Sequence, residues 1–378
     1  SHSTLLAFRI AAMGNCQDSA KNKAIDDAVP IIDETVRVGL IADIQYADRD
    51  DGSDYEGLEQ RHFRHALEVL RAAVECWNVQ GVSKIAQLGD AIDGCNAKAE
   101  AGTSANALRQ VLSILGRSSA QRVDLVGNHE LYNFKRSELK TCGLHLVGPN
   151  GLFYHSVHFG AHWEAIVLDP YELALIGVPE GDPSFKKAEK VLKVHNPHVI
   201  AAGGGGDWYR GLPRDKYRYV PFNGGMSVEQ LAWLEQALRA AQAERRKILV
   251  FSHVPLYEPA TKPKTLVWNC EQALAVLHRH KDAVVAVLAG HDHDGGYAVD
   301  NEGIHHITMH SALTAPPGTD CFAVLECHPD GSAHFRSHGR ACVQSGTRGV
   351  GRAYMDIFLA KGAKNEPSGP ALTGASTF

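Results

Sequence analysis

The sequence has no long hydrophobic run, no closely spaced cysteine pair and little net charge. No apolar stretch approaches the roughly 20 residues that a bilayer-spanning helix needs, so we expect no transmembrane segment. None of the eight cysteines forms a C-x-x-C pair, and a chain of 378 residues does not need disulfide bonds to fold. We therefore expect free thiols and a cytoplasmic protein. The net charge of −5 gives no reason to expect nucleic acid or an anionic membrane as a partner.

What is present indicates one large globular domain, because 44% of the residues are hydrophobic and 21% are charged. We expect residues 1–35 to form a flexible leader and residues 36–345 to form the main domain, with an irregular insertion at 196–226. Residues 346–378 form a C-terminal segment whose tail, rich in Gly, Ser, Pro and Thr, should be disordered. We expect a monomer.

The N-terminal residues allow two further interpretations. Residues 1–24 carry three basic side chains and the single acid Asp18, which is typical of an organelle-targeting segment. Alternatively, translation starts at Met13 and exposes Gly14 for myristoylation beside Cys16. The myristoylation rule requires Ser or Thr where Asp18 stands, so that match is incomplete. We favour a disordered leader.

Strand-like and helix-like patterns alternate along the chain. Apolar runs at 36–41, 85–88 and 123–126 predict buried strands, and apolar residues spaced by three and four predict helices over 63–77 and 108–115. Further strands are expected at 165–168, 248–251 and 284–288, and Ser227 with Gln230 predicts a capping box for a helix. Residues 321–327 and 333–338 predict a hairpin. This alternation favours an α/β fold with a mainly parallel sheet and helices on both faces.

Residues 131–226 are less regular, and four glycines at 203–206 predict an exposed loop. Two interpretations stay open for this stretch. It is either an insertion without chemistry or a segment that folds over the site and helps to select the substrate.

Metal-type side chains follow five of the predicted strands. These residues are Asp43 and Gln45, Asp90, Asn128, His253, and His291 with His293. Because parallel strands present ligands at their carboxyl ends, we expect the seven side chains to meet around two divalent cations. Such a pair needs one bridging carboxylate, for which Asp90 is the candidate, and neutral ligands that preserve positive charge for a phosphate.

A general acid is also expected beside the metals. A water shared by two cations would ionise near neutral pH and act as the nucleophile. The leaving oxygen then needs a proton, which His129 is placed to donate because it adjoins Asn128. Asp93, three residues after Asp90, is the candidate to hold His129 in the right tautomer.

These motifs resemble the calcineurin-like metallophosphoesterase superfamily over about residues 36–310. The resemblance implies a four-layer α/β/β/α sandwich, with one metal on Asp43, Gln45, Asp90 and His293 and the other on Asp90, Asn128, His253 and His291. Most of that superfamily has histidine where Gln45 stands. An amide oxygen is a harder ligand than imidazole, so we expect Mn²⁺, with Mg²⁺ as the other option.

Longer segments around the same residues closely resemble the manganese-dependent ADP-ribose/CDP-alcohol diphosphatases, which use glutamine at this position. The segments lie at 41–48, 87–94, 127–134, 222–225 and 290–297. This resemblance implies hydrolysis of ADP-ribose, CDP-choline, CDP-glycerol or a similar small nucleotide. Two alternatives use the same site, a phosphoprotein phosphatase and a cyclic-nucleotide phosphodiesterase. A third is a non-catalytic scaffold.

The substrate contacts are less well defined by the sequence. A nucleobase needs an aromatic face, which Tyr46, Tyr132 or Trp268 would provide, although each could equally serve in packing. Asn223 lies in a glycine-rich turn from which it would approach a phosphate or ribose.

Overall fold

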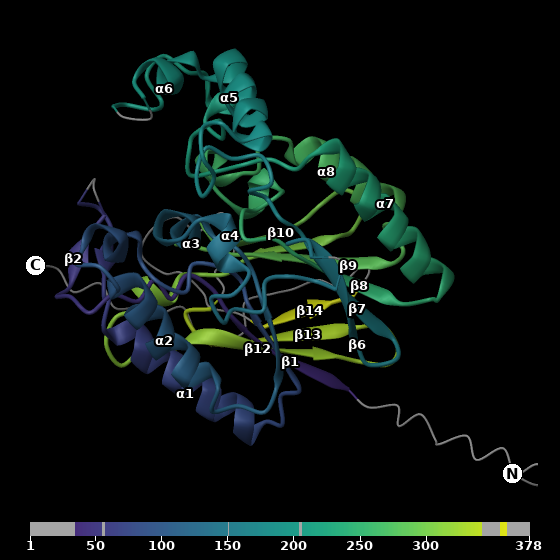
Figure 1. Cartoon of the computed structure of the whole chain (residues 1–378). Coiled ribbons are helices and arrows are strands. Elements are labelled where there is room, and N and C mark those ends of the chain that lie inside the picture. Colours follow the sequence, from purple (N-terminus) through teal and green to yellow (C-terminus); the bar gives the residue numbers. More distant parts are fainter. Residues whose placement is uncertain (1–34, 55–56, 150, 204–205, 342–355, 361–378) are drawn as a thin grey trace, which may run out of the picture. The chain divides into compact units, whose positions relative to one another are not determined.

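The computed structural model describes residues 35–360 except 55–56, 150, 204–205 and 342–355. Two six-stranded sheets pack face to face, and helices cover their outer faces (Figure 1). This is the four-layer sandwich that the resemblance implied. The predictions for the leader at 1–34 and for the tail at 361–378 lie outside the described residues. In the described part, no helix is long and apolar enough to cross a bilayer.

The first sheet mixes parallel and antiparallel strands. Its order is β14 (Ile357–Leu359), β13 (Ala333–Gly339), β12 (Cys321–Cys327), β1 (Val36–Ile41), β4 (Lys84–Gln87) and β5 (Gln121–Asp124). The predicted strands β1, β4 and β5 are parallel neighbours, and the predicted hairpin β12–β13 adds to them antiparallel.

The second sheet is also mixed. Its order is β10 (Gly296–Val299), β11 (His305–Thr308), β9 (Val284–Ala289), β8 (Lys247–Phe251), β7 (Trp163–Val167) and β6 (His155–Phe159). Strands β7, β8, β9 and β11 are parallel, whereas β6 and β10 are antiparallel additions at the two edges. The prediction of one mainly parallel sheet was therefore wrong, because the parallel strands divide between two sheets. A short ribbon, β2 (Gly52–Ser53) with β3 (Gln60–Arg61), stands apart from both.

Helices form the two outer layers. Near the first sheet lie α1 (His65–Val79) and α2 (Thr103–Leu115), and on the second lie α7 (Val228–Ala243) and α8 (Cys270–Arg279) (Figure 1). The remaining helical segments are α3 (Asn128–Asn133), α4 (Arg136–Leu139), α5 (Pro183–His195) and α6 (Pro197–Ala201), with short 3₁₀ turns η1 (Gly94–Lys98), η2 (Arg214–Lys216), η3 (Glu258–Ala260), η4 (Pro263–Thr265) and η5 (Ala312–Thr314). Of these, α6 and η2 fall within the predicted insertion at 196–226.

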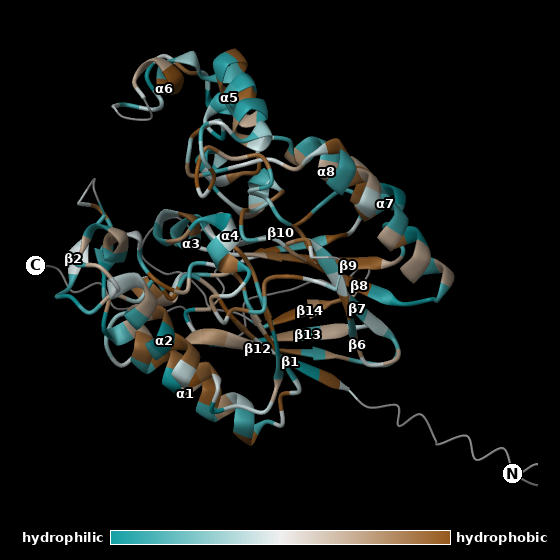
Figure 2. Cartoon of the chain, in the orientation of Figure 1, coloured by the Kyte–Doolittle hydropathy of each residue, from teal (hydrophilic) through white to brown (hydrophobic). Residues whose placement is uncertain are grey.

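Alternation along the strands separates two kinds of core. In β1, Val38 and Leu40 face the other sheet, where they meet residues such as Phe251, whereas Ile41 belongs to the cluster that packs with the helices. In Figure 2 several strands are brown, and the outer helices carry both brown and teal residues. Both faces of each central strand are thus buried, and the ends of the strands are left to carry the polar residues.

Two sequence features turned out differently in detail. The Ser227 hydroxyl accepts a hydrogen bond from the Gln230 N–H and so caps α7 as predicted, but the Gln230 side chain binds Asp169 and Glu172 and does not return to Ser227. The irregular stretch contains β6 and the 13-residue helix α5, for which no periodic signal was found. The six cysteines within the described residues are free thiols, as expected.

Candidate metal centre

The seven predicted ligands meet where strands from both sheets end. Asp43 and Gln45 follow β1, Asp90 follows β4, and Asn128 lies beyond β5, all in the first sheet. His253 follows β8, and His291 and His293 follow β9, in the second sheet. The two sheets are packed so that the carboxyl ends of these strands share one end of the sandwich. Asp43, Asp90 and His253 are each at most 1% exposed, which places the cluster inside the protein.

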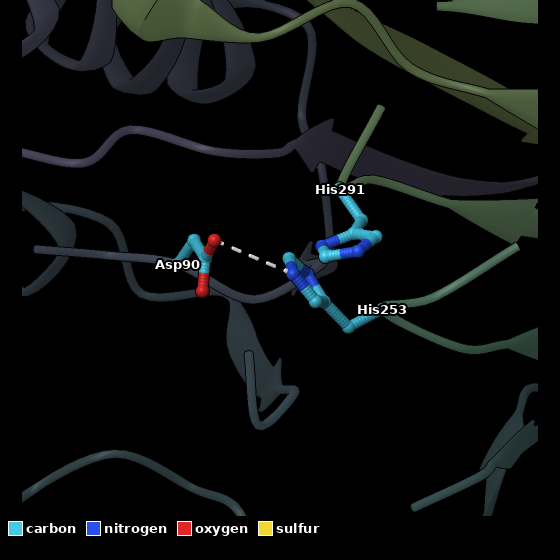
Figure 3. A group of neighbouring side chains, drawn as sticks. All are labelled: Asp90, His253 and His291. Atoms are coloured by element: carbon cyan, nitrogen blue, oxygen red, sulfur yellow. Dashed lines mark ion pairs between the residues drawn. The ribbon is translucent and has the colours of Figure 1, made fainter. Parts of the chain in front are cut away.

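One half of the cluster contains Asp90, His253 and His291 (Figure 3). Their candidate ligand atoms all lie within 4.8 Å of one another, and His253 Nε2 is 3.4 Å from Asp90 Oδ2. The side-chain oxygen of Asn128 adds a fourth group, 3.3 Å from His253 Nε2. The His253 Nδ1 faces the carbonyl of Leu88 at 2.7 Å, so Nε2 is the ring nitrogen that remains for a metal.

The other half contains Asp43, Gln45, Asp90 and His293. His293 Nε2 lies 3.6 Å from Asp43 Oδ1 and 2.8 Å from Gln45 Nε2, and Gln45 Nε2 lies 3.1 Å from Asp90 Oδ2. Asp90 therefore contacts both halves, as a bridging ligand must.

The local chemistry fits a pair of cations. Asp43 Oδ1 and Gln45 Oε1 are buried and have no hydrogen-bond partner among the described residues, which is costly unless another charge satisfies them. Glycines also allow the backbone to pass close to two of the carboxylates. A Cβ on Gly127 would lie 2.0 Å from Asp90 Oδ1, and one on Gly290 would lie 2.5 Å from Asp43 Oδ2. Oxygen and imidazole donors of this kind suit Mn²⁺ and related divalent ions.

Backbone strain is concentrated at the same residues. Five non-glycine residues in the described part have positive φ, and four of them are predicted ligands: Asp43 (50°), Gln45 (43°), Asp90 (60°) and His291 (70°). Such conformations cost about 1–3 kcal/mol each and persist where the surrounding structure enforces them. This clustering is typical of a functional site.

The electrostatics favour bound positive charge. Burial opposes ionisation of Asp90, but the charges of His253 and His129 hold its pKa below the usual value. Burial would likewise lower the pKa of His253, yet the Asp90 carboxylate raises it to about 9. Without metal, the protein thus holds protons where cations would bind, and metal binding would displace them.

Two carboxylates support the ligands from behind. Glu130 accepts hydrogen bonds from the backbone N–H groups of Asp90, Ala91 and Gly127, and thereby fixes the two ligand-bearing turns against each other. Glu59 Oε1 lies 2.7 Å from His293 Nδ1, which orients the ring so that Nε2 points to the metals. Sequence reasoning gave Glu130 no role although it lies in a quoted segment, and it missed Glu59, which follows no periodic pattern.

Two further side chains hold ligands in place. The Tyr171 hydroxyl lies 3.2 Å from both Asn128 Oδ1 and the carbonyl of Phe222. Asn223 is fully buried, and its Oδ1 lies 2.7 Å from His291 Nε2. The structure therefore places Asn223 at the edge of the cluster, in contact with a ligand.

His129 projects beside the ligands, and its hydrogen bonds define a tautomer. The N–H of Gly94 donates to His129 Nδ1 at 2.7 Å, so the ring proton is on Nε2, which lies 3.9 Å from Asp90 Oδ2. Asp93 Oδ2 is 3.4 Å from Nδ1 and accepts no hydrogen bond from any residue that the structure describes. In this structure the backbone of Gly94 sets the tautomer that sequence reasoning attributed to Asp93.

The aromatic candidates for substrate binding are placed differently from one another. Tyr132 is 40% exposed, and its ring meets the His129 ring edge-on at 5.3 Å. Tyr46 and Trp268 are 4% and 2% exposed, and both pack in hydrophobic clusters. Of the three, Tyr132 is therefore the one that combines substantial exposure with contact to the cluster.

A basic residue that the sequence analysis did not single out lies nearby. Arg61 Nε is 3.4 Å from Glu59 Oε1. Burial is the main cause of the lowered pKa of His129, and the positive charge of Arg61 lowers it further. The positive charge of Arg61 thus acts on both His129 and His293, whose pKa values it lowers.

A sandwich of two mixed sheets with this cluster at one end defines the metal-dependent phosphoester hydrolases. The sequence matches the calcineurin-like phosphoesterase family model over residues 36–295, and the chain belongs to that family. It is a hydrolase with a metal centre.

Relatives with curated names carry the comparison further. The chain is 35% identical over 308 residues to the manganese-dependent ADP-ribose/CDP-alcohol diphosphatases of Mus musculus and Homo sapiens, with 77% of this chain and 87% of each relative covered. It is 36% identical over 293 residues to the protein of the same name from Oryza sativa subsp. japonica, with 77% and 88% covered. Among solved structures, a dimetal phosphatase from Danio rerio superposes with a TM-score of 0.75 at 30% identity, covering 86% of this chain and 99% of that one.

Proposed function

We propose that the protein hydrolyses the diphosphate bond of small nucleoside diphosphate derivatives such as ADP-ribose, CDP-choline and CDP-glycerol. The products are a nucleoside monophosphate and a phosphorylated sugar or alcohol. The observation that carries this proposal is the 35% identity over 308 residues to relatives named for that activity. Gln45 also supports it. An amide oxygen at this position favours Mn²⁺, and the same relatives are named as manganese-dependent.

In the proposed centre, one metal is held by Asp43, Gln45, Asp90 and His293, and the other by Asp90, Asn128, His253 and His291. Two divalent cations there would polarise the phosphoryl oxygens and supply an activated water. Mn²⁺ is the preferred ion in this proposal and Mg²⁺ the second choice, since four oxygen-donor side chains contribute.

The protein's own groups complete the reaction. In the proposed reaction His129 first takes up a second proton, on Nδ1, and the imidazolium then donates its Nε2 proton to the oxygen that leaves the attacked phosphorus and returns to the neutral ring. Asp93, 3.4 Å from Nδ1, stabilises the ring when it is charged. Arg61, which lies beside Glu59, offsets the negative charge that gathers on the phosphoryl oxygens. Tyr132 offers its exposed ring to the base or sugar.

A substrate panel tests the proposal. The full chain, loaded in parallel with Mn²⁺ and with Mg²⁺, is assayed on ADP-ribose, CDP-choline, 2′,3′-cyclic AMP and a phosphopeptide. We expect the highest kcat/KM on ADP-ribose or CDP-choline with Mn²⁺. A higher value on the phosphopeptide or the cyclic nucleotide would replace the proposal with the corresponding alternative.

A further inference from the structure

A second polar cavity lies away from the metal centre, between the edges of the two sheets. Its volume is about 730 Å³. Strand β5 is the last strand of the first sheet, β6 is the last strand of the second, and residues of both line the cavity together with the segment 144–149. None of the seven predicted metal ligands is among its lining residues in the described part of the chain.

The polar lining of this cavity is basic. Arg122, Lys140 and three histidines, His145, His155 and His158, contribute to the wall, and no Asp or Glu in the described residues does so. Two buried carboxylates contact this wall: Asp124 is bound by an Arg122 Nη at 3.1 Å and by the N–H of His145, and a Glu164 oxygen lies 3.8 Å from His158 Nε2. Such a wall attracts an anion, and arginine with lysine is a combination suited to phosphate.

Two buried polar atoms of residues on this wall have no hydrogen-bond partner within the described part of the chain. His155 is 6% exposed, and its Nδ1 makes no hydrogen bond to any described residue. The Nε of Arg122 is likewise buried and unpaired, although the rest of that guanidinium binds Asp124 and the carbonyl of Gly143. Folded proteins rarely leave such groups unsatisfied. Both atoms belong to side chains that line the cavity, so this wall has hydrogen-bonding capacity that no described residue uses.

The rest of the wall is apolar. Leu144, Leu146, Val147 and Val157 line it, and the volume is in the range of pockets that enclose small organic ligands. A free inorganic ion would leave this apolar surface unused. The ligand therefore combines an anionic group with a flat or apolar part.

We propose that this cavity is a second binding site, which takes a phosphorylated small molecule of about the size of a nucleoside monophosphate. The phosphate contacts Arg122, Lys140 and His155, and the ring portion packs on the apolar wall. The site does not depend on the proposed reaction at the metal centre, because it shares no residue with it.

Equilibrium dialysis of labelled AMP against the Mn²⁺-loaded full chain tests the proposal. We expect Lys140→Glu and His155→Leu each to weaken AMP binding at this site by at least about tenfold, so that at an AMP concentration equal to the wild-type Kd its occupancy falls from about one half to below about one tenth. Lys190→Glu, an exposed lysine of α5 that does not line the cavity, is the matched control and should bind AMP as the wild type does.

The thermal stability of the variants shows whether His155 binds the ligand or only supports the fold. His155→Leu removes an unsatisfied buried group, so its Tm should equal or exceed that of the wild type while AMP binding falls. Hydrolytic activity at the metal centre should stay unchanged in both variants. Equal AMP binding in the wild type and both variants would overturn the proposal. Adenosine, which lacks the phosphate, should not bind there, and its binding as tightly as AMP would overturn the phosphate assignment.

Discussion

His253 Nε2 lies 3.4 Å from Asp90 Oδ2, although the two residues follow strands of different sheets. The contact joins the first sheet, through β4, to the second, through β8. It exists because the carboxyl ends of parallel strands in both sheets are brought to one end of the sandwich. The metal centre is therefore a property of the packing of the sheets as well as of the motifs.

Replacing His129 should remove the general acid and leave the metals in place. We expect His129→Ala to lower kcat on ADP-ribose by about 10²–10⁴-fold, because the leaving oxygen then departs without a proton. The loss should be much smaller on a p-nitrophenyl phosphodiester, whose leaving group needs no proton. Steady-state rates on both substrates measure this. His198→Ala, at an exposed histidine of α6, is the control, and an equal loss on the two substrates would refute the role of His129 as an acid.

Glu59 should tune metal affinity through His293. Burial opposes ionisation of Glu59, but His293 lowers its pKa to about 2, so the carboxylate is charged and holds the ring. We expect Glu59→Gln to weaken Mn²⁺ binding by about 10–100-fold. Titration of activity against free Mn²⁺ measures the change. Glu100→Gln, at an exposed glutamate, should titrate as the wild type does, and an unchanged titration of Glu59→Gln would remove the proposed support.

The hydroxyl of Tyr171 should act through Asn128. In Tyr171→Phe the ring stays and only the contacts to Asn128 Oδ1 and the Phe222 carbonyl are lost. We expect Mn²⁺ affinity and kcat to fall by about tenfold or more with little change in KM. Tyr154→Phe is the matched control, since Tyr154 is buried against Trp233 away from the cluster. Identical kinetics of the two variants would limit Tyr171 to packing.

A carboxylate remote from the metals should give pH-dependent stability. Asp300 Oδ2 lies 2.9 Å from His278 Nε2 and 3.0 Å from His306 Nε2. Burial would raise the pKa of Asp300, but the hydrogen bonds from His306, from the Ile304 N–H and from His278 lower it below its usual value.

A lowered pKa stabilises the fold above the pKa of the unfolded state, about 3.9, and this stabilisation is lost as the pH falls through the lower, folded-state value. We therefore expect Asp300→Asn to reduce the free energy of unfolding by about 2 kcal/mol at pH 7, with the difference narrowing below about pH 4. Urea denaturation at several pH values measures it. A difference that is constant with pH would mean that the charge of Asp300 contributes nothing.

The clustering of the seven predicted ligands could be expected from the sequence because each of them follows a recognisable strand. Asp90, for example, comes after a run that can only be a buried strand, so its place at a sheet edge follows from local pattern. The predicted acid His129 lies beside the cluster for the same reason, since it adjoins Asn128, whereas the tautomer role predicted for Asp93 falls to the backbone of Gly94.

What the sequence did not contain is the contact between distant segments. Glu59 reaches His293 from a short ribbon outside both sheets, and Tyr171 reaches Asn128 from beyond β7. Neither residue lies in a strand-like or helix-like sequence pattern that would have indicated a role at the site. The prediction of a single sheet was wrong because strand periodicity reports burial and not which strands are neighbours. Trp268 was a reasonable aromatic candidate, yet its side chain closes a hydrophobic cluster.

The most direct test of the account is the Mn²⁺ content of the full chain and of Asp90→Asn. The side chain of Asp90 contacts both halves of the cluster, so the wild type should bind two Mn²⁺ per chain and Asp90→Asn should lose tight binding of both, with activity reduced at least about 100-fold. Asp48→Asn, at an exposed aspartate, controls for the charge change. Retention of two tightly bound Mn²⁺ in Asp90→Asn would contradict the two-metal centre described here.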